Sequence, residues 1–99
     1  MTDFLELKRQ FELELSNDLK FELLELHYAP YSFGSGMTVY KIKGQLIQII
    51  FDGKDNIIEL LISVNDLKYP SSTWTKIFSG TPTDFFDNGL TKLKKLRAI

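Results

Sequence analysis

The sequence predicts a single α+β domain with an N-terminal helix, a four-stranded antiparallel meander sheet, and one short and one longer C-terminal helix. Three observations carry this prediction. Apolar residues recur at helical spacing near both ends of the chain, they alternate with polar residues through its middle, and Gly, Pro, Asn and Asp separate the segments. The 99 residues match the size of one domain, and they contain no internal repeat or linker that would divide them.

The first segment has the pattern of an amphipathic helix. Its apolar residues are spaced so that they share one helical face, and they are Phe4, Leu7, Phe11 and Leu15. Thr2 can act as the N-cap, which places Asp3 in the first turn, where a negative charge interacts favourably with the helix dipole. The turn-forming residues Ser16-Asn17-Asp18 then end the helix.

The middle of the chain predicts a meander of four strands. The alternation over residues 19–28 changes parity at Leu23-Leu24, which predicts a β-bulge. Pro and Gly make residues 29–36 a loop. The remaining strands follow at residues 37–43, 45–51 and 56–64.

The sequence Asp52-Gly53-Lys54-Asp55 is typical of a tight hairpin between the last two strands. If Gly53 and Lys54 form a two-residue loop, apolar residues face apolar ones and polar residues face polar ones. The facing pairs are then Asp52–Asp55, Ile49–Ile58, Gln48–Glu59 and Ile47–Leu60. This register predicts a positive φ at Gly53, where a valine would destabilise the fold by about 1 kcal/mol or more.

Two helices are predicted after the sheet. Ser71 or Ser72 can cap a short helix that ends at Ser79-Gly80 and carries Trp74, Ile77 and Phe78. In Thr81-Pro82-Thr83-Asp84, a hydroxyl N-cap, a proline in the first turn and a following acid together predict the start of a longer helix. Asn88-Gly89 predicts a break or kink in that helix, whose apolar stripe is Phe86, Leu90 and Leu93.

Composition and charge exclude several classes of site. The chain is 43% hydrophobic and has no Cys, so disulfides, thiolate metal sites and cysteine nucleophiles are absent. It begins without the basic and apolar regions of a secretory signal, and its longest nearly apolar stretch, residues 46–51, is too short for a membrane span. We therefore expect a cytoplasmic protein with no membrane contact.

Opposite charges gather at the two ends of the chain. Residues 1–26 contain seven acids and three bases, whereas the last ten residues contain four bases and no acid. Attraction between two neighbouring terminal helices explains this asymmetry better than a site for an anionic partner does. Nucleic-acid binding is the less favoured explanation, because no aromatic residue accompanies Lys92, Lys94, Lys95 and Arg97.

No motif predicts catalysis, a metal or a cofactor. His27 is the only histidine, and no nucleophile elbow accompanies it. Gly34-Ser35-Gly36 precedes a strand and not a helix, so it lacks the setting of a phosphate-binding loop. Asp52, Asp55 and Asn56 lack the spacing of a calcium loop and are what a hairpin requires.

Two surfaces are candidates for binding a partner. The aromatic residues Tyr28, Tyr31 and Phe33 surround a Pro/Gly loop, where they are either exposed anchors or a lid folded over the sheet. In the predicted register, one sheet face is wholly apolar and should lie under the helices. The opposite face carries four large aliphatic residues among its seven, which are Leu46, Gln48, Ile50, Ile57, Glu59, Leu61 and Ser63.

By elimination, the sequence favours a non-enzymatic protein-interaction domain, such as a small inhibitor, an immunity-type protein or an adaptor. The partner would be another protein or a second copy that covers the second sheet face, unless the helices divide between both faces. The alternative is a small-ligand-binding domain with an aromatic-lined pocket between sheet and helices, and an enzyme is the third possibility. The candidate partner-binding residues are Tyr28, Tyr31, Phe33, Leu46, Ile50, Ile57 and Leu61.

Overall fold

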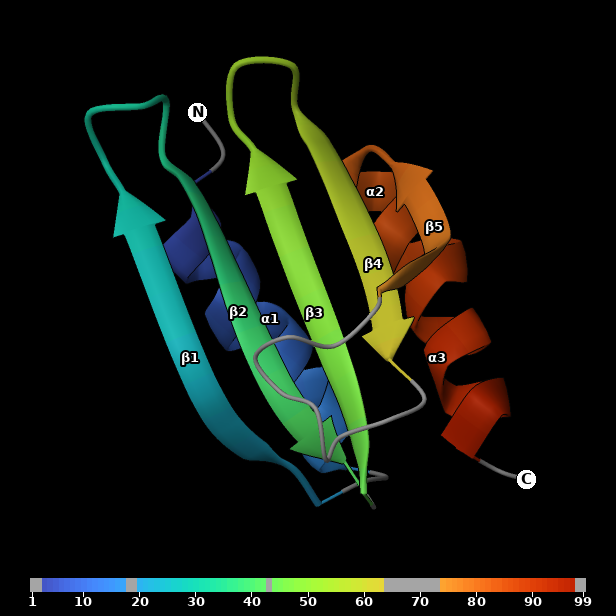
Figure 1. The fold of residues 1–99 in the computed structure, drawn as a ribbon. Coiled ribbons are helices and arrows are strands. Elements are labelled where there is room, and N and C mark those ends of the chain that lie inside the picture. Colours follow the sequence, from blue (N-terminus) through green and yellow to red (C-terminus); the bar gives the residue numbers. More distant parts are fainter. Residues whose placement is uncertain (1–2, 18–19, 43, 64–73, 98–99) are drawn as a thin grey trace.

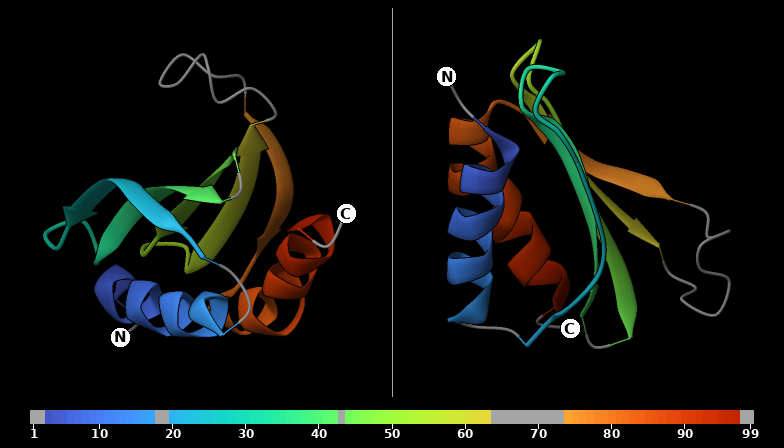
Figure 2. Two further views of the ribbon diagram at one scale, coloured as in Figure 1. Left: turned by 90° about the horizontal axis from the view of Figure 1, so that it is seen from below. Right: turned by 90° about the vertical axis from the view of Figure 1, so that its left-hand side faces the viewer.

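The computed structural model describes residues 3–17, 20–42, 44–63 and 74–97. These residues form a five-stranded antiparallel sheet in the order β1-β2-β3-β4-β5, with the helices packed on one side of it (Figures 1 and 2). The elements in chain order are α1 (Phe4–Ser16), β1 (Glu22–Ala29), β2 (Ser35–Ile42), β3 (Gln45–Asp52), β4 (Ile57–Ser63), β5 (Thr75–Gly80), α2 (Pro82–Asp84), the π-helical turn η2 (Phe85–Gly89) and α3 (Leu90–Arg97). The predicted α+β class is confirmed, but the sheet has five strands and not four.

Helix α1 buries the stripe that its spacing predicts, because Phe4, Leu7, Phe11 and Leu15 are all buried. Its N-cap is Asp3, whose side chain accepts a hydrogen bond from the Leu5 amide at 2.8 Å. The prediction that Thr2 is the cap and that Asp3 lies in the first turn is therefore wrong, and Thr2 itself lies outside the described residues. Asp3 serves because its side chain stands next to the first orphan amides of the helix, which any short acceptor can satisfy.

Strand β1 begins at Glu22 and pairs antiparallel with β2. Its register shifts between Leu23 and Glu25, which confirms the predicted bulge. The bulge follows from the sequence, because two successive leucines cannot share one face of a regular strand. Leu19, with which the predicted strand began, lies outside the described residues.

The hairpin between β3 and β4 corrects the predicted register. Asp52 pairs with Ile57, so the loop has four residues, Gly53 to Asn56, and not two. Asn56 takes the left-handed conformation with φ 58°, and Gly53 does not have a positive φ. The Asp52 carboxylate accepts hydrogen bonds from the amides of Lys54 and Asp55, at 3.0 and 3.4 Å, which favours the wider turn.

The corrected register differs from the predicted one by two residues, so each side chain stays on its predicted face. Phe51 faces Ile58, Ile49 faces Leu60, and Ile47 faces Ile62. The predicted pairing of Gln48 with Glu59 is wrong, because these residues face Leu61 and Ile50. Val64, with which the predicted strand ended, lies outside the described residues.

Gly53 is required for a different reason from the predicted one. A Cβ atom at this position would lie 1.8 Å from the carbonyl oxygen of Phe33, in the neighbouring loop. The Gly53 amide also donates a hydrogen bond to Ser35 Oγ at 2.8 Å. The two hairpin loops therefore touch through backbone, and only glycine leaves room for this contact.

The predicted short helix around Trp74, Ile77 and Phe78 is wrong, because Thr75 to Gly80 form strand β5 on the edge of β4. Ser71 and Ser72 lie outside the described residues. A bulge next to Ile77 lets both Ile77 and Phe78 pack against the core, as two neighbouring apolar residues do on a helix. Local pattern alone does not separate the two structures, and pairing with β4 selects the strand.

The C-terminal helical segment starts as predicted. Thr81 Oγ1 accepts a hydrogen bond from the Asp84 amide at 3.3 Å, and Pro82 occupies the first turn. The predicted interruption is also confirmed, since residues 85–89 form a π-helical turn that ends at Gly89. A Cβ atom on Gly89 would lie 2.9 Å from the Phe85 ring, so the widened turn brings backbone and ring together.

The core lies between the sheet and the helices and is rich in aromatic rings. Phe11 of α1 makes edge contacts with Tyr40 of β2 and Phe85 of η2, with ring centroids 5.7 and 6.0 Å apart. This contact confirms that the two terminal helical segments are neighbours. Among the described residues, no helix is long and apolar enough to span a membrane.

Candidate functional site

The sheet has one face without a helix, which we call the open face. Both helical segments lie on the other side, so the possibility that the helices divide between the two faces is excluded for the described residues (Figure 2). The strand pairing places the seven predicted residues of β3 and β4 on the open face, together with Met37 of β2. A face that combines aliphatic and charged residues in this way is suited to contact with another molecule.

The open face is not uniformly accessible. Leu46, one of the candidate binding residues, is only 1% exposed, and Val39 and Ser63 on the same face are equally buried. Met37, Ile50 and Leu61 are half-buried, and Ile57 is exposed. The accessible part of the face therefore lies toward the end that carries the two hairpin loops.

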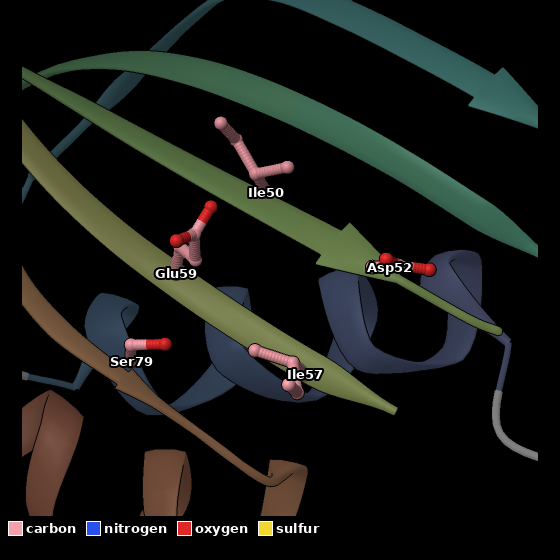
Figure 3. Close-up of a pocket in the computed structure, with 5 residues that line it drawn as sticks. All are labelled: Ile50, Asp52, Ile57, Glu59 and Ser79. Atoms are coloured by element: carbon pink, nitrogen blue, oxygen red, sulfur yellow. The ribbon is translucent and has the colours of Figure 1, made fainter. Parts of the chain in front are cut away.

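A hollow of about 210 Å³ lies on this part of the face, across β3, β4 and β5. Figure 3 shows its five lining side chains in front of the sheet, with the helices behind. The aliphatic side chains of Ile50 and Ile57 alternate there with the polar groups of Asp52, Glu59 and Ser79. Lys76 of β5 forms an ion pair with Glu59, which leaves Asp52 as the carboxylate at the hairpin end of the hollow.

A second hollow of about 420 Å³ adjoins the first. Its walls include His27 of β1, Met37 of β2 and Tyr31 of the loop between those strands. Ile50 lines both hollows. We call the two hollows together the depression, and their lining residues reach from the loop after β1 across the open face to β5.

The aromatic loop, defined as residues 30–34, forms one rim of this depression. Tyr31 is 91% exposed and Phe33 is 52% exposed, so neither side chain is a lid packed on the sheet. Phe33 also holds the left-handed conformation, with φ 58°. That conformation is uncommon for a bulky residue, and it is held here by the backbone contact between Phe33 and Gly53.

The other aromatic residues of this region have structural roles. The Tyr28 hydroxyl donates a hydrogen bond to Asp3, which ties β1 to the cap of α1 and raises the pKa of Tyr28. Tyr40 is fully buried, and its hydroxyl donates to Glu12 Oε2 at 2.6 Å. Burial, and then this hydrogen bond to an acid, raise the pKa of Tyr40 well above its usual range.

His27 lies at the outer strand and its Nε2 is 2.7 Å from Glu25 Oε2. Both side chains are accessible to solvent, and no strained nucleophile accompanies them among the described residues. Within the residues that the structure describes, no three His, Asp or Glu side chains converge as metal ligands would. The residues that line the depression combine aliphatic, aromatic and carboxylate side chains.

The space between sheet and helices is filled by packed rings. Phe4, Phe11 and Phe85 are fully buried there with Tyr40. A third hollow, of about 370 Å³, lies instead between α1 and the start of the C-terminal helical segment, beside Gln10, Thr83 and Asp87. The sequence suggests a ligand pocket between the sheet and the helices. These packed rings leave no cavity among themselves, and the ligand pocket stays a hypothesis.

Sequence reasoning missed two parts of this site. Ser79 and Lys76 reach the open face only because residues 75–80 form a strand, where a helix was expected. The contact between the loops at Phe33 and Gly53 joins segments about twenty residues apart, and no local pattern reveals it. The comparisons with known protein families, curated proteins and solved structures found no match to this chain.

Proposed function

We propose that this protein is a non-enzymatic protein-interaction domain, of the inhibitor, immunity-type or adaptor kind, that binds its partner through the open face and the aromatic loop. A single observation supports this most directly. Ile50 lines both hollows, and Tyr31 lines one of them, so the exposed Tyr31 side chain and the aliphatic side chains of the sheet lie along neighbouring hollows of one surface.

The chemistry of this surface resembles that of protein contact sites. Exposed tyrosine and phenylalanine are typical anchors, since each supplies a large contact area with few rotatable bonds to order. Ile57 and Ile50 extend the apolar area, and Asp52 and Glu59 provide polar groups within it. Shallow apolar surface with polar groups at its border is typical of the centre and rim of an interface.

The experiment combines cross-linking and affinity measurement. A photo-reactive amino acid in place of Tyr31 should cross-link one partner in cells of the source organism, whereas the same group in place of Leu13 should not. Leu13 is a matched control, because it is exposed on α1, away from the open face. Tyr31→Ala and Ile50→Lys should then each weaken binding of the purified partner about tenfold or more.

Two results would contradict the proposal. One is a cross-linked partner whose affinity is unchanged by both Tyr31→Ala and Ile50→Lys. The other is equal cross-linking from positions 31 and 13. If the captured protein is a second copy of this chain, sedimentation should show a dimer, and the double variant Ile50→Lys, Leu61→Lys should be a folded monomer.

A further inference from the structure

Among the described strands, β1 stands at one end of the sheet, and its leucines are exposed on the face that the helices cover elsewhere. It is an eight-residue strand at the end of the strand order, and Figure 1 shows it at the margin of the sheet. Leu23 and Leu26 pair with Tyr40 and Thr38 of β2, which are both 0% exposed. Leu23 and Leu26 themselves are 40% and 43% exposed.

The reason lies in the position of α1. Among the strands, this helix packs chiefly on β2, so β1 extends beyond the helix that covers its neighbour (Figure 2). Leu24, at the bulge, is exposed as well. An outer strand with exposed leucines can act as a template for pairing with another strand, and the part of β1 that follows its bulge contains no proline.

We infer that β1 pairs antiparallel with β1 of a second copy of this chain, about a two-fold axis through Leu26. An axis perpendicular to the sheet keeps each face on its own side, so the leucine side chains of both copies meet beneath the joined strands. Leu26 then faces Leu26 of the second copy. The bulge precedes Glu25, so the central three pairs fall in the regular part of the strand.

Charge favours this register over the one centred on Glu25. With the axis at Leu26, Glu25 faces His27 of the second copy, and the symmetry repeats this pair on the other side. With the axis at Glu25, two carboxylates would face each other, which is destabilising. Within one chain the Glu25 carboxylate is already 2.7 Å from the His27 ring, so the pairing brings two carboxylates and two imidazole rings together on the open side of the joined sheet.

This inference concerns the outer edge of β1 and does not depend on the proposed function, although His27 belongs to both surfaces. Sedimentation velocity of the wild-type chain from about 10 µM to 1 mM should show a reversible monomer–dimer equilibrium, because an edge contact of one strand is small. Amide chemical shifts on dilution should change in residues 25–28 and not around Ile50. A wild-type chain that stays monomeric, or changes centred on Ile50, would overturn the inference.

Complementary charge variants test the register itself. His27→Glu gives a chain with two acids on this edge, and Glu25→Lys with His27→Lys gives a chain with two bases. Each alone should dimerise about tenfold more weakly than the wild type, because the two-fold axis applies the like-charge pair twice. An equimolar mixture should form a heterodimer at least as tight as the wild-type dimer.

Controls separate pairing from folding. Leu26→Lys places two ammonium groups at the axis and should weaken dimerisation by more than about tenfold, while Leu13→Lys should leave it unchanged. The charge variants lie at solvent-accessible positions, so they remain informative if Leu26→Lys does not fold. A mixture that associates no better than its separate components would show that β1 does not pair in this register.

Discussion

The two faces of the sheet are built from the same strands, and they differ in accessibility toward the end that carries the two hairpin loops. On the helix side, Ile47, Ile49 and Leu60 are fully buried. On the open side, their neighbours Gln48, Ile50 and Glu59 are only half-buried. The strand sequences alternate in a way that permits this difference, but the placement of both helices on one side creates it. One face therefore holds the fold together, and the other is available for recognition.

The largest expected effect comes from removing a ring on the helix side. Phe11 is fully buried between Phe4, Tyr40 and Phe85, so Phe11→Ala should lower the free energy of unfolding by about 3–5 kcal/mol. Ile50→Ala, on the open side, should cost about 1 kcal/mol or less, because its side chain already touches solvent. Urea denaturation measures both, and equal losses would mean that the two faces do not differ as described.

The next effect concerns the loop contact that supports the recognition side. Gly53→Ala places a Cβ atom against the Phe33 carbonyl oxygen and should destabilise the fold by about 2 kcal/mol. Gly44→Ala is the matched control, since its Cβ would meet no atom within 4 Å and its cost, about 1 kcal/mol, comes from φ +81° alone. If thermal unfolding shows that Gly53→Ala destabilises the protein no more than Gly44→Ala does, the two loops are not in the close contact described.

A pH titration tests the polar contact within the buried face. The folded state raises the pKa of Tyr40 above its unfolded value near 10, so its protonated form stabilises the fold below that pH and this contribution is lost above it. From about pH 10 upward, the wild type should lose up to about 1.4 kcal/mol per pH unit more than Tyr40→Phe. The ring contacts stay in the variant, so parallel pH profiles would contradict the assignment to the hydroxyl group.

The smallest of these effects belongs to the start of the second helical segment. Thr81→Ala removes the acceptor for the Asp84 amide and should cost about 1 kcal/mol. Thr81→Ser keeps the hydroxyl group and serves as the control. Thr81 lies at the start of a helical segment that packs on the side of the sheet away from the open face. The loss of stability should therefore appear in the unfolding midpoint, and the proposed binding through the open face should be unchanged. A midpoint equal to that of the serine variant would refute the cap.

Local sequence determined much of this fold, for physical reasons that act within a few residues. The apolar stripe of α1 and the cap at Thr81 depend on helical spacing and on the nearest orphan amides. The bulge in β1 and the facing of β3 and β4 depend on the two-residue period of a strand. The predicted pairing of β3 with β4 was wrong by two residues. Each side chain nevertheless lies on its predicted face, because a shift of two residues is one full period of a strand.

Tertiary structure decided the features on which the proposed recognition and the proposed self-pairing rest. Residues 75–80 became a strand because the edge of β4 offers backbone partners that a short isolated helix lacks. Both helical segments pack on one side, and α1 packs chiefly on β2. Ile50 is therefore partly accessible on the open face, and Leu26 is exposed at the edge of the sheet. Gly53 is needed because a distant loop approaches it. Each of these features depends on contacts between segments far apart in the chain, which residue spacing does not encode.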